Sequence, residues 1–155
     1  MLYLDSSALV RRYFKEVGSG ALIARATDPT EELFTSVLIY AEVHSVMARK
    51  HREGKINAAT LHKLREDFES DWVNLFNAVK LNLPTMAALP NLLERYPVKS
   101  GDAIQLSIAI WLNKEMEAEN QSGAKRVLEF GVADRKLAIA ANACGLQVFN
   151  PEDEN

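Results

Sequence analysis

The chain has 155 residues, of which 48% are hydrophobic and 25% charged, a size and balance that fit one globular domain with a buried core and exclude a disordered segment. Its net charge of −3 excludes the diffuse basic surface of a general nucleic-acid binder, so any contact with nucleic acid must be local. A single cysteine excludes an intramolecular disulfide, and without a signal-like start or an apolar run of roughly 20 residues we expect a cytoplasmic protein with no membrane contact.

Two strand-to-helix units and a long amphipathic helix are predicted in the first half of the chain. Thr35 or Ser36 is expected to cap the helix after the second strand. Asn57 is expected to cap the long helix, whose apolar side chains recur at helical spacing as far as Leu75. In chain order, the predicted elements are a strand over residues 1–4, helices over 8–14 and 21–26, a strand over 33–36, and helices over 37–50 and 57–75.

The second half continues the alternation of strands and helices. Its predicted elements are a short helix between Pro84 and Tyr96, a nearly all-apolar helix over 103–116 opened by Ser100-Gly101-Asp102, a surface loop over 117–125, a strand over 127–133, a helix that ends at Gly145 and a strand over 146–149. Parallel crossovers need connections long enough to hold a helix, so this alternation favours the α/β class. We expect one domain over residues 1–150, with a mainly parallel central sheet of four to five strands flanked by helices on both faces, and a short acidic tail over 151–155.

Four acidic residues stand out by their positions. Asp5 and Asp134 directly follow predicted strands, at the sheet edge where sites form in α/β folds, although an aspartate there can equally be a helix cap. Glu42 shares its helix face with apolar neighbours. Asp102 lies in the first turn of the most hydrophobic helix, where the helix dipole and capping by Ser100 would by themselves explain it.

Taken together, the four acids favour a metal site over four separate caps. Ionised carboxylates on buried faces are costly unless they are paired or bound to a metal. One or two Mg²⁺ or Mn²⁺ ions, which prefer oxygen ligands, would remove that cost. Such ions activate water for attack on a phosphodiester, so no nucleophilic side chain is needed. We therefore predict that Asp5, Glu42, Asp102 and Asp134 form the catalytic metal site of a phosphodiesterase.

Other chemistry finds little support in the sequence. Cys144 lies on an apolar helical stripe and is expected in the core. The three histidines, His44, His51 and His62, lack the cysteine partners and the spacing of a zinc site. A second group of acids, Asp67, Glu69 and Asp71, is expected to form a solvated helix face.

With these residues in view, the chain resembles the PIN domain nucleases, and within them the VapC-type toxins of prokaryotic toxin–antitoxin pairs. The resemblance covers nearly the whole chain and rests on four segments in the family's order: 3–10 around Asp5, 35–43 around Glu42, 101–106 around Asp102, and 133–137 with its continuation to Leu146 around Asp134. It departs at Val132, where family members often carry Thr or Ser. This departure leaves open whether Asp134 would bind a metal directly or through a water molecule.

The resemblance implies a Mg²⁺- or Mn²⁺-dependent endoribonuclease, the toxin of a toxin–antitoxin pair, in which the four acids bind metal and cleave RNA. It also implies a homodimer and a small antitoxin protein as partner. Ser7 is expected to support the site by hydrogen bonding or to cap the first helix. Arg11 and Arg12, which follow Asp5 closely, are the expected contacts to the RNA phosphates.

Two other functions remain open for the same constellation. A PIN-fold binding module with little or no turnover would act through protein or RNA contacts alone. A metal-dependent nuclease acting on DNA or flap structures would use the same acids.

Overall fold

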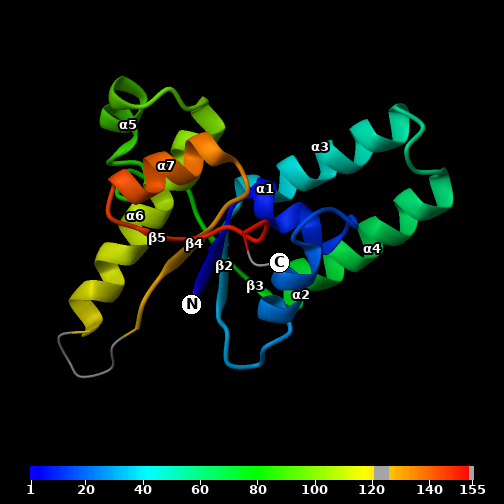
Figure 1. Cartoon of the computed structure of the whole chain (residues 1–155), viewed down its shortest axis with the longest axis horizontal. Helices are drawn as coiled ribbons and strands as arrows, with labels where there is room; N and C mark the ends of the chain where they lie inside the picture. The colour runs from blue at the N-terminus through cyan, green and yellow to red at the C-terminus, as the bar shows by residue number, and fades with distance from the viewer. Residues whose placement is uncertain (121–125, 154–155) are drawn as a thin grey trace.

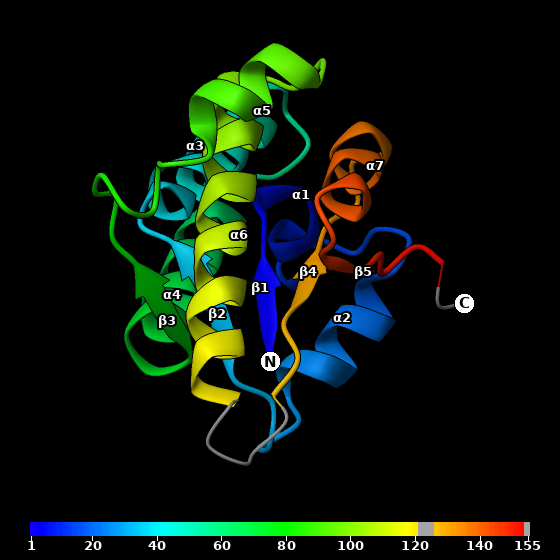
Figure 2. The same ribbon diagram turned by 90° about the vertical axis from the view of Figure 1, so that its left-hand side faces the viewer.

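A parallel β-sheet crosses the middle of the molecule (Figures 1 and 2). The structure is a computed structural model that describes residues 1–120 and 126–153. Its described strands form a five-stranded sheet in the order β3-β2-β1-β4-β5, in which every neighbouring pair is parallel. The strands are β1 (Leu2–Leu4), β2 (Leu33–Ser36), β3 (Phe76–Val79), β4 (Glu129–Gly131) and β5 (Gln147–Phe149). The predicted single α/β domain is therefore confirmed.

Helices cover both faces of the sheet, as the alternating pattern predicts. One face is covered by α1 (Ser6–Leu9), its 3₁₀ continuation η1 (Val10–Arg12), α2 (Ser19–Ala26), α3 (Leu38–Arg52) and α4 (Ala58–Asn74), and the other by α5 (Leu89–Arg95), α6 (Ser100–Asn120) and α7 (Arg135–Ala143) (Figure 1). Successive side chains of a strand point to opposite faces. Leu2 and Leu4 accordingly belong to the first of two cores, whereas Tyr3 belongs to the second.

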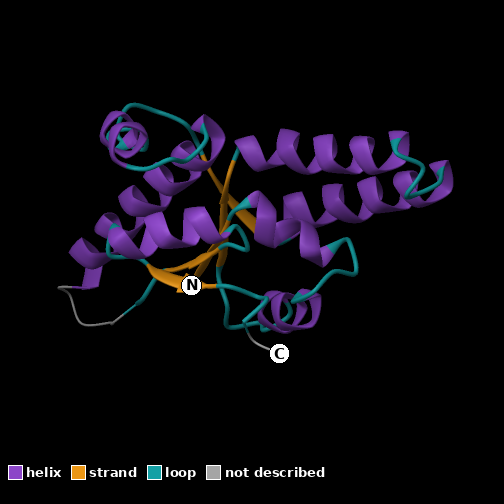
Figure 3. Ribbon diagram, turned by 45° about the horizontal axis from the view of Figure 1, so that its top comes forward, coloured by secondary structure: helices purple, strands orange, loops and turns teal. Residues whose placement is uncertain are grey.

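Helices α3 and α4 form an antiparallel pair that extends beyond the sheet (Figure 3). Phe68 of α4 is fully buried and lies against the rings of Tyr13, Tyr40 and His44. Asp67, Glu69 and Asp71 were expected to form a solvated face, but all three bind other side chains, Asp67 through an ion pair with Lys63. Asp71 accepts hydrogen bonds from Arg12 and Tyr13, and Glu69 accepts one from Tyr40. The expectation is wrong for Asp71, whose side chain is 20% exposed, whereas the side chains of Asp67 and Glu69 are 48% and 46% exposed.

The carboxyl ends of the strands meet the amino ends of several helices at one edge of the sheet (Figure 2). Asp5 separates β1 from α1, Asp134 separates β4 from α7, and Val37 separates β2 from α3. Helix α6 also begins at this edge, close to α1 and α7. The topology thus brings together four segments that lie far apart in the sequence.

Three details differ from the sequence-based expectations. Strand β3 follows α4 directly, where no strand was predicted. Neither Thr35 nor Ser36 caps α3, because both lie in β2 with fully buried side chains; Val37 takes the cap position without a side-chain hydrogen bond. Helix α6 continues through Asn120, so residues 117–120 are helical, while the remainder of the expected loop, 121–125, lies outside the described residues.

Residues near the carboxyl terminus contact the helices that follow β1. Pro151 is buried, and its carbonyl group lies against Gly18. Glu152 forms an ion pair with Arg11. The first residues of the expected acidic tail therefore pack on the domain.

Within the described part of the chain, no helix is long and apolar enough to span a membrane.

Candidate active site

Asp5 is the most buried of the four predicted acids, with an exposed fraction of 2%. It is the N-cap of α1, and its Oδ1 accepts hydrogen bonds from the Ser7 amide at 2.7 Å, the Ala8 amide at 3.1 Å and the Ser7 hydroxyl at 2.6 Å. No described residue donates to Oδ2. The carboxylate is thus fixed by one oxygen while the other remains available for a ligand.

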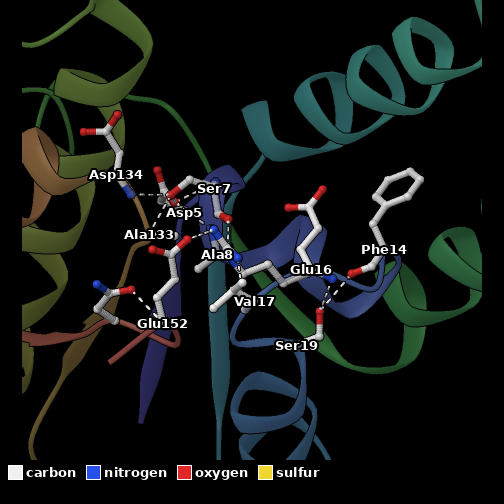
Figure 4. A network of polar contacts seen from close by, with 12 residues as sticks. Asp5, Ser7, Ala8, Phe14, Glu16, Val17, Ser19, Ala133, Asp134 and Glu152 are labelled. Carbon is white, nitrogen blue, oxygen red and sulfur yellow. Dashed lines mark hydrogen bonds and ion pairs between the residues drawn. The ribbon is translucent and has the colours of Figure 1, made fainter. Parts of the chain in front are cut away.

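Ser7 joins the first acid to the fourth (Figure 4). Its hydroxyl donates to Asp5 and accepts from the amides of Ala133 at 2.9 Å and Asp134 at 3.2 Å. Asp134 itself is exposed and is the N-cap of α7, where its Oδ1 accepts from the amides of Lys136 and Leu137. Ser7 therefore ties the loop after β4 to the loop after β1.

Glu42 lies on α3, half-buried, with its carboxylate directed toward α6. Its Oε2 accepts a hydrogen bond from Nε2 of Gln105 at 3.3 Å. Its Oε1 lies beside Gly101, at 3.3 Å from the place where a Cβ atom would stand on that residue. A side chain at position 101 would thus press on the Glu42 carboxylate and displace it by a few tenths of an ångström.

Asp102 occupies the first turn of α6, as predicted, but Ser100 does not cap this helix. The Lys99 carbonyl accepts the bond from the Ala103 amide at 2.9 Å, so Lys99 holds the cap position and Ser100 is already helical. The Asp102 carboxylate bonds back to the Lys99 backbone. Asp102 therefore helps to cap α6, and its side chain is half-buried at the edge of the candidate site.

Burial and mutual repulsion raise the pKa of three of these acids. Burial raises the pKa of Asp5 to about 7; the hydrogen bonds from Ser7 and Ala8 oppose the shift, and the charge of Asp102 adds to it. Burial also raises the pKa of Glu42; hydrogen bonds from Ser6 and Gln105 oppose the shift, and the charge of Asp102 adds to it. The pKa of Asp102 is raised by burial and by the charge of Asp134. Asp102 thus interacts with each of the other three acids.

The donor set suits a hard divalent cation, because carboxylate oxygens are preferred ligands and a cation would relieve the repulsion that these pKa shifts express. Among the described residues, however, no three His, Cys, Asp or Glu side chains are grouped closely enough to hold a metal ion as they stand. Cation binding at this edge would therefore require small side-chain movements that bring the acids closer to Asp102.

A cavity of about 290 Å³ opens beside two of the acids. It is lined by Pro97, Val98, Lys99, Asp102, Asp134, Arg135, Lys136 and Leu137. The three cations of this set, which we call the α6–α7 cations, are Lys99, Arg135 and Lys136. All three are exposed, and none forms an ion pair with a described acid. Their charges face the same space as the carboxylates, which suits a phosphate group held next to a metal site.

Arg11 and Arg12, the arginines expected to contact RNA, are engaged inside the protein. Arg11 is buried, donates to the carbonyls of Ser7 and Val17, and pairs with Glu152. Arg12 pairs with Asp71 at 2.6 Å. Although a larger cavity of about 470 Å³ lies beside Arg12, none of the four acids lines it. These contacts favour structural roles for both arginines.

Sequence reasoning missed Lys99 and the polar partners of Glu42. A lysine three residues before an acid in the first turn of a helix was a usable signal for a cation beside Asp102. Gln105 was also visible as a polar residue inside the most apolar helix of the chain. Its partner Tyr3, by contrast, is 102 positions away in the sequence and could not have been assigned.

Comparisons with known proteins agree with the fold. A model of the PIN domain family matches residues 2–116, which include Asp5, Glu42 and Asp102. Among solved structures, the chain is similar to the crystal structure of FitAcB from Neisseria gonorrhoeae, with a TM-score of 0.66 and 17% sequence identity over 97% of this chain and 98% of that one. No curated protein matches the chain.

Proposed function

The chain belongs to the PIN domain family, whose members are generally nucleases, and we propose that it is a divalent-metal-dependent endoribonuclease that hydrolyses RNA phosphodiester bonds. The observation that carries the proposal is that Asp5, Glu42, Asp102 and Asp134 lie at the carboxyl edge of the sheet, where Asp102 raises the pKa of Asp5 and Glu42 and is itself affected by the charge of Asp134. We further propose that the protein is the toxin of a toxin–antitoxin pair.

In this proposal, Asp5, Glu42 and Asp102 hold one or two Mg²⁺ or Mn²⁺ ions, and Asp134 does so directly or through a water molecule. When bound, such ions lower the pKa of the attacking water and neutralise charge on the phosphate. Ser7 keeps one oxygen of Asp5 occupied and thereby fixes the direction of the other. The α6–α7 cations, rather than Arg11 and Arg12, bind the RNA backbone, because they face the cavity and are not paired within the described structure.

The test is cleavage of single-stranded RNA by the purified protein with Mg²⁺, with Mn²⁺ and with chelator. We expect cleavage only with metal, and a loss of at least 100-fold in kcat/KM for Asp5→Asn and for Asp102→Asn. Asp67→Asn, on the exposed side of α4, is the control and should leave the rate unchanged. Unchanged cleavage by the first two variants would exclude this site.

The arrangement of the acids also keeps a second function in view. Because no three described acids are grouped as a ready metal site, the same surface could belong to a PIN-fold binding module with little turnover. Metal binding without cleavage of RNA or DNA would favour that module, and cleavage of DNA alone would make the protein a DNA nuclease.

The proposed partners are a second copy of the chain and a small antitoxin protein, and the proposed location is the cytoplasm. Light scattering of the purified protein tests the homodimer. Purification of the protein together with the product of a neighbouring gene, followed by loss of RNA cleavage in the complex, tests the antitoxin.

A further inference from the structure

Gln105 is a buried polar residue in the most apolar helix of the protein. It is 1% exposed and its neighbours Ala103, Leu106 and Ile108 are fully buried. A primary amide in such surroundings is costly unless its donor and acceptor groups are both bonded. Two side chains provide these bonds: the phenol of Tyr3 donates to Oε1 at 2.7 Å, and Nε2 donates to Glu42 at 3.3 Å.

The chemistry of these partners fixes the direction of the amide. A carboxylate accepts hydrogen bonds and donates none, so the amide must present its nitrogen to Glu42 and its oxygen to Tyr3. The phenol, which is fully buried and stacks on Phe130, then has to donate. With its oxygen bonded to the phenol of Tyr3, the amide keeps its nitrogen toward the Glu42 carboxylate.

Glu42 is held from two sides as a result. Gln105 of α6 bonds one carboxylate oxygen, Ser6 of α1 also hydrogen-bonds the carboxylate, and Oε1 faces Gly101, which has no side chain to displace it. Gln105 and Gly101 both belong to α6, which also carries Asp102. Helix α6 thus supplies, through Gln105, one of the two hydrogen bonds that hold Glu42, although Glu42 itself belongs to α3.

We propose that Gln105, oriented by Tyr3, is a positioning residue that holds the Glu42 carboxylate on the side of Asp102, from which a divalent cation can draw the two carboxylates together. This inference rests on the metal site of the proposed function. Gln105 does not contact the cation. It acts through Glu42, in the way that residues behind metal ligands orient those ligands.

The experiment is calorimetric titration of the intact, RNA-free protein with Mn²⁺. We expect Gln105→Leu to weaken Mn²⁺ binding about tenfold. Tyr3→Phe, which keeps the stacked ring and removes the hydroxyl, should weaken it several-fold, because the amide is no longer oriented. Ser107→Ala is the matched control: Ser107 is equally buried on α6, but it bonds the Thr85 carbonyl, so its loss should leave Mn²⁺ affinity unchanged.

A double-mutant cycle separates positioning from a general structural effect. If Gln105 acts through Glu42, then Gln105→Leu should cause no further loss of Mn²⁺ affinity in a Glu42→Gln background. Additive losses would overturn the proposal. So would unchanged Mn²⁺ affinity in Gln105→Leu or, should that variant fail to fold, in Tyr3→Phe.

The readout also separates this inference from the proposed nuclease activity. If Mn²⁺ binding depends on Gln105 but the protein cleaves no RNA, the positioning role is supported and the proposed nuclease activity is overturned. Metal-dependent cleavage of RNA, together with a Mn²⁺ affinity that does not depend on Gln105, would support the nuclease activity and overturn the positioning role. A wild-type protein that binds no Mn²⁺ would overturn both.

Discussion

At position 101, two demands on one residue conflict. In the second position of a helix, alanine is preferred to glycine, by about 0.5–1 kcal/mol in a helix interior. A Cβ atom there would nevertheless lie 3.3 Å from Oε1 of Glu42, closer than carbon and oxygen normally approach, so the carboxylate would have to move. A glycine at position 101 therefore favours the position of the Glu42 carboxylate at some cost to the stability of α6.

Gly101→Ala should accordingly separate activity from stability. We expect kcat/KM for RNA to fall about tenfold, as for other changes behind a metal ligand, while the Tm stays the same or rises slightly. Gly20→Ala is a closely matched control, because Gly20 is also the second residue of its helix and its added Cβ would meet no atom within 4 Å. Equal activity in the two variants would show that Glu42 tolerates the displacement.

Among the elements, α6 and α7 contribute most to the site, because both present their amino ends to the cavity that holds Asp102 and Asp134. A helix amino end carries partial positive charge and attracts phosphate. Here that charge is joined by Lys99 before α6 and by Arg135 and Lys136 at the start of α7. RNA should therefore lie along these two helix ends.

Removing Arg135 and Lys136 together tests this path. In the double variant Arg135→Ala, Lys136→Ala, we expect KM for RNA to rise about tenfold with little change in kcat, since phosphate contacts supply affinity and not chemistry. The slope of log affinity against log salt concentration should become shallower by about 1.4, because each of the two lost phosphate contacts to a single strand contributes roughly 0.7 to that slope. Lys114→Ala, roughly 18 Å along α6 from Asp102, should change neither. An unchanged salt dependence in the double variant would place the RNA elsewhere.

At the level of elements, the sequence predicted most of the fold because buried strands and capped helices leave local signals. Asn57 does cap α4, accepting from the Thr60 amide, and Gly145 ends α7 with a positive φ of 84°. Strand β3 left no such signal: it lies at the sheet edge, two of its residues are exposed, and it contains Asn77 and Ala78, which are poor strand formers. The strand conformation of β3 is determined by its pairing with β2.

At the candidate site, the positions of the four acids could be predicted from local signals, but their surroundings could not. The four acids are recognisable locally, since each begins or lines a predicted helix. The roles of Arg11 and Arg12 depend on Glu152 and Asp71, which lie 141 and 59 positions away, and no local pattern reports such distant pairs. For the same reason the link from Tyr3 through Gln105 to Glu42 became visible only in the fold.

For the molecule as a whole, the buried acids make stability depend on pH and on metal. The pKa of Asp5 is about 7 in the folded protein against an ordinary value of 3.8, so between these values the folded state binds more protons than the unfolded state. The free energy of unfolding should therefore fall as pH rises from about 4 through 7. The raised pKa values of Glu42 and Asp102 act in the same direction.

Asp5→Asn should remove much of this dependence while keeping the cap, because asparagine also caps helices well. We expect the metal-free wild-type protein to melt at a higher temperature at pH 5 than at pH 8. The variant should be the more stable of the two proteins at pH 8, since it no longer buries that charge.

Mg²⁺ at 100 times its Kd should stabilise the wild type by about 2.7 kcal/mol and the variant by far less. Thermal unfolding at pH 5 and pH 8, with and without Mg²⁺, measures both effects. The control variant Asp67→Asn should show the same changes in melting temperature as the wild type. If the metal-free wild type were more stable at pH 8 than at pH 5, Asp5 would not be a buried acid with a raised pKa. The proposed role of Asp5 as a metal ligand would then lose its support.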